Sequence, residues 1–433
     1  MEETYFRRGF GLKKQVKPII DAEYHSQLVD RIRARGYTDV FGDITVRLAQ
    51  EFGFCYGVDR AIDYAYETVT KFPGRNIYLV GEIIHNPHVN ERMREMGIRF
   101  LYPREDQSFD FSHLTPRDVV LIPAFGVTRQ DFRTLREIGC LLVDTTCGSV
   151  LNVWKRVERY ARDGFTALVH GKYTHEESRA TASQVTLFDR GKYLIVRNME
   201  EAELVCDYIA HRPGSMSTRE FREHFREKAT PGFDPEKDLC RVGVANQTTM
   251  LANESLAIAA RIREAMVAGH GEEYASERFR SFDTICSATQ ERQDAVEEMM
   301  AQPPDVMIVI GGYNSSNTNH LASMCREYTV TYHIEDSVCI DTTTGTVRHK
   351  PELDPTAAEL VARDWLPEGP FQLGITAGAS TPNNKIGEAL ARVLAIRGEL
   401  PRREAPDERV EAGGARPVRL PSLPVQTTAT PRH

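Results

Sequence analysis

The chain has 433 residues, of which 41% are hydrophobic and 27% are charged, a composition typical of a globular protein with room for two or three cores. Its formal net charge of −8 and isoelectric point near 6.0 argue against binding to nucleic acid or to an anionic membrane surface. No apolar run reaches the roughly 18 residues that a membrane-spanning helix needs.

The first fifteen residues, MEETYFRRGFGLKKQ, lack the apolar stretch of a secretion signal, and their acidic residues argue against an organelle transit peptide. Eight cysteines at irregular spacing then predict reduced thiols, a metal site or catalysis rather than a disulfide framework. We therefore expect a protein of the cytoplasm.

Residues 1–43 predict a charge-rich, helical N-terminal extension that packs on the surface and carries no chemistry. From residue 44 strands alternate with helices in three rounds, which predicts an α/β fold of three similar units with small parallel sheets, at 44–146, 147–281 and 282–399. The predicted strands are 44–48, 77–80, 119–122, one from residue 141, 166–169, 193–196, 242–245, 282–285, 306–310, 329–334 and 372–376. The helices predicted in the first unit are 58–70 and 88–96.

Two segments interrupt this alternation. The charged, turn-rich stretch 211–239 predicts a surface insertion with a short helix inside the second unit. Residues 400–433 contain six prolines, many charges and no aromatic residue, so they cannot bury a core and predict a disordered tail.

Three cysteines, Cys55, Cys147 and Cys286, each lie in a tight turn between a predicted strand and the start of a helix, where backbone N–H groups favour a thiolate. The chain has no C-x-x-C pair, so three separated thiolates suit an iron–sulfur cluster better than structural zinc. A 4Fe–4S cluster with three protein ligands leaves one iron open as a Lewis acid. The other cysteines fit the role of small hydrophobic residues: Cys140, Cys206, Cys240, Cys325 and Cys339.

Histidines follow two of the predicted strands. His85 comes soon after the strand at 77–80, and His175 follows the strand at 166–169, with Glu176 and Glu177 beside it. A carboxylate in this position is a candidate proton donor with a raised pKa. The alternative is that both acidic residues only favour the dipole at a helix start.

Three further strand-to-helix turns are rich in hydroxyl and amide groups: 246–249, 314–317 and 378–381. Such turns bind anions through N–H and hydroxyl groups, although helix caps use the same residues. Together with His85 and His175 they indicate a polyanion such as a diphosphate. The phosphate-binding motifs of nucleotide sites are absent from the sequence, which argues against a nucleotide.

Eight motifs, in this order along the chain, resemble those of the 4-hydroxy-3-methylbut-2-enyl diphosphate reductase family, which acts last in the methylerythritol phosphate route to isoprenoids. They are GFCYGVDRAI, GEIIHNPHVN, DTTCGSV, HGKYTHEES, NQTTM, DTICSATQERQ, NSSNTNHL and GASTP. The resemblance covers roughly residues 44–395. The N-terminal extension and the insertion resemble the cyanobacterial and plant-plastid branch of that family.

The resemblance implies three similar units around a central 4Fe–4S cluster held by Cys55, Cys147 and Cys286. It implies Glu177 as proton donor and Thr248 as the residue that orients the substrate hydroxyl. It implies reductive dehydroxylation of the allylic diphosphate to isopentenyl and dimethylallyl diphosphate. The residues implied to bind the substrate are His85, His175, Thr248, Ser315, Ser316, Asn317 and Ser380. Glu176 is expected to point away and serve the helix start.

The resemblance also implies an electron donor protein, a ferredoxin in this branch, and location in a bacterial cytoplasm or, for a plastid-bearing source, the plastid stroma. Two positions depart from the family pattern. Phe125 stands where many bacterial members have a His that contacts the diphosphate, so Phe125 is expected either at the rim of the site or in the core. Gly148 stands where Pro is common, which affects only the turn.

Two other functions remain open from the sequence. A non-redox iron–sulfur hydro-lyase would use the same open iron without external electrons. A cluster-bearing RNA-associated or regulatory protein would need a basic face, for which the net charge gives no support.

Overall fold

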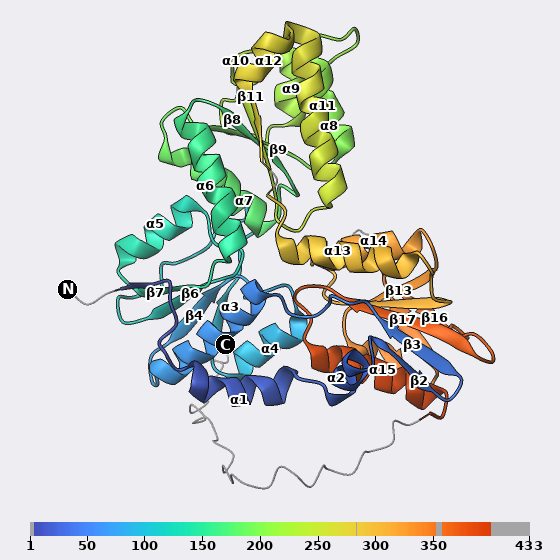
Figure 1. Ribbon diagram of the computed structural model, residues 1–433. Coiled ribbons are helices and arrows are strands. Elements are labelled where there is room, and N and C mark those ends of the chain that lie inside the picture. The colour runs from blue at the N-terminus through green and yellow to red at the C-terminus, as the bar shows by residue number, and fades with distance from the viewer. Residues whose placement is uncertain (1–3, 283, 352–356, 400–433) are drawn as a thin grey trace, which may run out of the picture.

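The computed structural model describes residues 4–282, 284–351 and 357–399 and has three α/β bodies, each built on its own sheet (Figure 1). Two of these sheets are entirely parallel and the third is parallel except for one edge strand. The predicted α/β fold with several small parallel sheets is therefore confirmed. The tail predicted at 400–433 lies outside the described residues.

The first sheet has the strand order β1-β7-β6-β4-β5 and is parallel throughout. Its strands are β1 (Tyr5–Phe6), β4 (Ile77–Val80), β5 (Arg99–Leu101), β6 (Val119–Ile122) and β7 (Leu141–Asp144). Its helices are α1 (Lys13–Tyr24), α3 (Tyr56–Lys71), α4 (Pro87–Glu95) and α5 (Arg129–Ile138). The central strands are buried along their whole length, as expected for parallel strands covered on both faces.

The second sheet has the order β11-β10-β8-β9 and forms the upper body in Figure 1. Its strands are β8 (Thr166–His170), β9 (Lys192–Val196), β10 (Val242–Asn246) and β11 (Phe279–Ser281). Its helical elements are α6 (Gly148–Arg162), α7 (Glu176–Ser183), η1 (Gln184–Leu187), α8 (Met199–Ile209), α9 (Thr218–His224), α10 (Pro235–Asp238), α11 (Ala252–His270) and α12 (Glu272–Arg278). The strand predicted at 282–285 is wrong, because the ladder with β10 ends at Ser281.

The insertion at 211–239 is more than a surface feature. It forms two short helices, α9 and α10, and buries Phe221, Phe225 and Phe233 in the same apolar cluster as the strands of the second sheet. The charged residues between these three aromatic residues obscured the pattern of buried positions in the sequence.

The third sheet has the order β13-β12-β17-β3-β2, with β2 alone antiparallel. Its strands are β2 (Thr38–Phe41), β3 (Ile44–Leu48), β12 (Val306–Ile310), β13 (Val330–Ile334) and β17 (Phe371–Ala377). A small antiparallel sheet beside it contains β14 (Ile340–Asp341), β15 (Thr346–His349) and β16 (Leu360–Ala362). The helical elements are α2 (Gln27–Ala34), α13 (Ser287–Met300), α14 (Ser316–Arg326), η2 (Ser337–Cys339) and α15 (Asn383–Ile396).

The pairing of β3 changes one predicted boundary. The strand at 44–48 was assigned to the first unit, but β3 hydrogen-bonds to β17 and so lies in the third sheet. After this strand the chain returns to the first body at α3, whose Ala61, Ile62 and Ala65 pack in the core of the first sheet.

The N-terminal extension also differs from a purely surface segment. Its strand β1 extends the first sheet and its strand β2 extends the third, while Val16, Ile20 and Val29 are buried. The extension therefore ties two of the three bodies together. Within the described part of the chain, no helix is long and apolar enough to cross a membrane.

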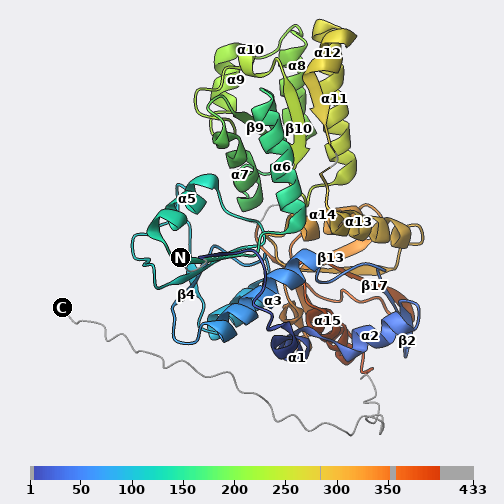
Figure 2. The ribbon, with the colours of Figure 1, turned by 60° about the vertical axis from the view of Figure 1, so that its left-hand side comes forward.

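The bodies meet at one point, where loops following the carboxyl ends of β4, β7, β8, β10, β12 and β17 converge (Figures 1 and 2). In parallel α/β sheets ligands bind at this edge. The fold thus brings together turns that are separated by up to three hundred residues in the sequence.

Candidate functional site

The three cysteines singled out by the sequence all begin a helix. Cys55, Cys147 and Cys286 are the N-cap residues of α3, α6 and α13, and each is half-buried. The N-terminal turn of α13 directs donors to the sulfur, since Cys286 Sγ accepts a hydrogen bond from the Thr289 N–H at 3.3 Å. Of the remaining cysteines, the buried ones are Cys140, Cys206, Cys325 and Cys339, whereas Cys240 is partly exposed.

Gly57 lies between the first two cysteines. A Cβ atom at this position would lie 2.5 Å from Cys147 Sγ and 3.8 Å from Cys55 Sγ, so a side chain there would displace a sulfur. Not all three cysteine sulfurs lie within 4.8 Å of one another. Three thiolates on one zinc ion would be about 3.8 Å apart, given Zn–S bonds of about 2.3 Å. The three sulfurs as they lie here therefore do not have the spacing of ligands to a single zinc ion.

The charges around the cysteines fit the predicted cluster. Burial raises the pKa of Cys55 and raises that of Cys286 to about 11, so neither thiol ionises readily without a metal. The buried guanidinium of Arg292 donates to the carbonyls of Gly53 and Ala288, each at 2.7 Å, and its charge partly opposes the rise in the pKa of Cys55. No carboxylate in the described part of the chain pairs with Arg292. A buried cation beside Cys55 favours a negatively charged group at this site.

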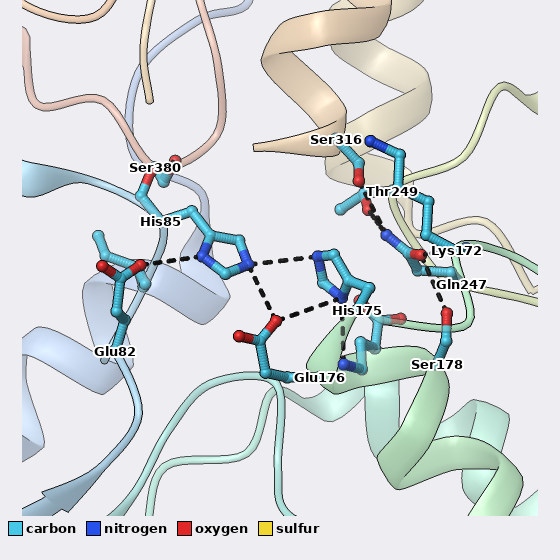
Figure 3. A network of polar contacts seen from close by, with 12 residues as sticks. Glu82, His85, Lys172, His175, Glu176, Ser178, Gln247, Thr249, Ser316 and Ser380 are labelled. Atoms are coloured by element: carbon cyan, nitrogen blue, oxygen red, sulfur yellow. Dashed lines mark hydrogen bonds and ion pairs between the residues drawn. The ribbon is translucent and has the colours of Figure 1, made fainter. Parts of the chain in front are cut away.

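Two histidines, one from the first body and one from the second, lie side by side (Figure 3). His85 Nε2 lies 3.2 Å from His175 Nε2, and His85 Nδ1 lies 3.1 Å from Glu82 Oε2. His175 Nδ1 accepts the N–H of Glu177 at 3.1 Å, which places its proton on Nε2. Burial and the neighbouring His85 lower the pKa of His175 to about 3. Burial also lowers the pKa of His85, but the hydrogen bond that Nδ1 donates to Glu82 and the charge of Glu176 outweigh burial, so the net pKa is raised.

Glu177 is the second residue after His175, and it is buried, with only 1% of its surface exposed. Its Oε1 accepts the N–H of Thr248 at 2.6 Å. Burial raises its pKa to about 7, although the hydrogen bonds with Thr248 oppose the shift. Thr248 also accepts, through its carbonyl, the N–H of Cys286 at 3.3 Å. One residue therefore connects the buried acid to a cysteine of the candidate cluster site.

Glu176 does not point away from the site, contrary to the expectation from the sequence. Its carboxylate lies 3.6 Å from His85 Nε2 and 3.9 Å from His175 Nδ1. Burial raises its pKa, but the two imidazoles outweigh burial and lower it overall. Glu176 is the first residue of α7, and its partly exposed side chain lies beside the two histidines (Figure 3).

The hydroxyl and amide turns lie around the histidines. Ser380 Oγ donates to the His85 carbonyl at 3.0 Å, and Asn317 Oδ1 accepts the Ala379 N–H at 2.9 Å. Ser315 caps α14, and Ser315, Ser316 and Asn317 are all buried. The Asn317 Nδ2 group is buried without a hydrogen-bond partner among the described residues. An unpaired buried donor indicates a place for an acceptor such as a phosphate oxygen.

Phe125 lies at the site and not in the core. Its ring stacks on His85, with centroids 4.2 Å apart and planes 20° from parallel, and it meets the edge of His175 at 5.7 Å. It is half-buried. An apolar ring therefore occupies the position where the family resemblance places a histidine.

Lys172 is a site residue to which the sequence assigned no role, and Gln247 was predicted only as part of the anion-binding turn at 246–249. The Gln247 amide nitrogen donates to Ser316 Oγ at 3.1 Å and its oxygen accepts Ser178 Oγ at 3.0 Å, which joins the second and third bodies. The Lys172 side chain extends beside Gln247 toward Ser316 (Figure 3). Lys172 could have been predicted as an anion-binding residue, because it lies within HGKYTHEES, next to a predicted polyanion site.

Comparisons with known proteins agree with these features. The model of the LytB protein family matches residues 46–394. A 4-hydroxy-3-methylbut-2-enyl diphosphate reductase of Thermosynechococcus vestitus is 47% identical over 397 residues, covering 91% of this chain and 95% of the relative. One of Gloeobacter violaceus is 46% identical over 403 residues, covering 92% and 93%.

A solved structure supports the fold alone. The E-1-hydroxy-2-methyl-but-2-enyl-4-diphosphate reductase from Plasmodium falciparum is 19% identical, with a TM-score of 0.58, and the match covers 80% of this chain and 86% of that one. The resemblance read from the eight motifs is confirmed: the chain belongs to the LytB protein family.

Proposed function

We propose that the chain is a 4-hydroxy-3-methylbut-2-enyl diphosphate reductase that converts its substrate to isopentenyl and dimethylallyl diphosphate. The reaction consumes two electrons and two protons, breaks the allylic C–O bond and releases water. The observation that carries the proposal is the buried Glu177, with a pKa of about 7, between a histidine pair and the residue that contacts Cys286. The close curated relatives with this name support it.

Cys55, Cys147 and Cys286 would hold a 4Fe–4S cluster. When bound, the cluster supplies electrons one at a time and Lewis acidity at its open iron. The chain contributes the buried cation Arg292 and the close approach of backbone at Gly57. Arg292 lowers the free energy of a negative charge beside Cys55, and the absence of a side chain at Gly57 leaves room for the Cys147 sulfur.

His85 and His175 would bind the diphosphate together with Ser315, Ser316, Asn317 and Ser380. Only one proton fits between the two Nε2 atoms at 3.2 Å. A diphosphate offers acceptor oxygens to both rings, so substrate binding lets each Nε2 carry a proton and relieves that competition. The unpaired Asn317 Nδ2 and the nearby Lys172 add donors for the same anion.

Glu177 would deliver the proton that turns the leaving hydroxyl into water. Because Oε1 accepts from the Thr248 N–H, the acid proton resides on Oε2. A pKa of about 7 makes the acid half protonated near neutral pH and still able to release its proton. Thr248 would orient the substrate hydroxyl toward that proton.

We further propose that the electrons come from a reduced ferredoxin and that the protein works in the cytoplasm, or in the plastid stroma if its source has plastids. The organisms of the similar relatives support this reading.

The deciding experiment is product analysis after anaerobic incubation of the holoenzyme with the hydroxylated diphosphate and a reduced small-molecule donor such as methyl viologen. We expect both isomeric products, and no turnover without the donor. Turnover without a donor would instead identify a hydro-lyase, and failure to react at all would overturn the assignment.

A further inference from the structure

A groove of about 870 Å³ runs between α6 and the start of α13 and reaches Cys286. Figure 2 brings α6 to the front, with its first turn near the point where the three bodies meet. Charged residues of α6 line one side of the groove: Lys155, Arg156, Glu158, Arg159 and Arg162. Four cations and one carboxylate on a chain of net charge −8 make a local field of the opposite sign.

Most of these cations are available to a partner. Lys155 and Arg159 are exposed, lie one helical turn apart, and form no ion pair within the described part of the chain. Arg162 lies 3.5 Å from Asp163 at the helix end, a contact weakened by exposure. Arg156 stacks over the ring of Phe282, with its guanidinium carbon 4.1 Å from the centroid. Internal ion pairs therefore do not neutralise the four cations of α6.

One exposed aromatic side chain lies with the cations, since Phe282 is 39% exposed beneath Arg156. A second, Tyr56, is 80% exposed and directly follows Cys55 in the sequence. Aromatic and arginine side chains are the residues that most often anchor protein interfaces. Phe282 and Tyr56 lie close in the sequence to Cys286 and Cys55, so a partner that contacts them would come close to the proposed cluster.

We propose that this groove, lined by α6 and the start of α13, is the docking surface for a small acidic electron-transfer protein of the ferredoxin type. The inference rests on the proposed reductase function and adds where the donor binds. Each docked donor is oxidised by one electron, which enters beside Cys286. Two successive donors, with two protons, balance the replacement of the substrate C–OH bond by C–H and the release of water.

The test compares a protein donor with a small donor in the same holoenzyme. Lys155→Glu/Arg159→Glu reverses two charges of the groove, and neither residue touches the proposed substrate or cluster site. With a reduced acidic [2Fe–2S] ferredoxin at low ionic strength, we expect the second-order rate constant to fall about 10-fold or more. With methyl viologen the rate should equal that of the wild type.

The matched control is Arg219→Glu, an exposed arginine on α9 at the far end of the second body that forms no ion pair among the described residues (Figure 1). It makes the same kind of charge reversal and should leave the ferredoxin-driven rate unchanged. Direct titration calorimetry should show weaker ferredoxin binding for the groove variant only, and high salt should abolish the difference.

The possible results separate the two proposals. Equal ferredoxin-driven rates and affinities in the wild type and the groove variant would overturn the docking surface, as would an equal loss in the Arg219 control. A wild-type holoenzyme that is inactive with methyl viologen would overturn the reductase function instead.

Discussion

Replacing Glu177 by Gln tests the proton donor. The amide keeps the size of the side chain and can still accept the Thr248 N–H, but it has no acidic proton. We expect near-normal iron content and substrate affinity, with kcat lowered by at least about 10²-fold, the lower end of what general acids contribute.

The pH dependence gives a second readout. The pKa of Glu177 is raised from 4.5 to about 7 by burial, so activity should decline as pH rises through about 7, where the folded enzyme loses the acid proton. The same shift corresponds to about 3 kcal/mol of stability that the wild type loses as pH rises from about 4.5 to 7. The Gln variant should lack both effects and should match or exceed the wild-type thermal midpoint at pH 8.

The assay is steady-state turnover with methyl viologen across pH 6–9, alongside anaerobic titration of the diphosphate substrate and thermal unfolding. Glu176→Gln is a comparison rather than a neutral control, because its carboxylate faces the imidazoles of His85 and His175. We expect it to change KM more than kcat. A Glu177→Gln enzyme with normal kcat, or one that keeps the alkaline decline, would refute the reasoning.

Three further outcomes follow from the site. Replacing any of the three N-capping cysteines by Ser should cripple cluster assembly, measured as iron and acid-labile sulfide per chain, whereas the buried Cys325→Ser should assemble normally; full occupancy in all three would contradict the ligand set. Gly57→Ala should lower cluster content because its Cβ would lie 2.5 Å from a cysteine sulfur, and normal content would show that the sulfur can move. Phe125→His should lower KM for the diphosphate by adding a donor beside His85, and an unchanged or higher KM would show that the stacked ring itself positions His85.

Local pattern in the sequence predicted much of the fold. Buried parallel strands such as 119–122 and 306–310 read as continuous apolar runs, and their bounds agree with the structure. The sequence could not predict which strands pair with each other, because nothing near residues 44–48 indicates that they pair with β17 more than three hundred residues later. The strand before Cys286 was misplaced because Phe282 and Ile285 mimic a strand although the ladder ends at Ser281.

The candidate site was also predicted only in part from the sequence. The sequence predicted that strand-to-helix turns would meet, because parallel strands gather their carboxyl ends, and the structure brings His85 to Ser380 and Gln247 to Ser316. The direction of a side chain was not predicted, as Glu176 demonstrates: its orientation depends on the imidazoles that tertiary packing brings near it. Arg292 was also missed, since its role depends on carbonyls from Gly53 and Ala288 that only the folded chain presents.

The pairing of β3 with β17 also sets the order of events during synthesis on the ribosome. The second body, from α6 to β11, uses consecutive residues and can fold soon after it emerges. The third sheet cannot close until Phe371–Ala377 has left the exit tunnel, and the Cys55 N–H is held by the carbonyl of Ala379 in the following loop. Of the three cysteines, Cys55 therefore waits longest for its final position. The cluster proposed above would then enter this chain only after synthesis, and a nascent chain stalled before β17 would leave Cys55 without its final position.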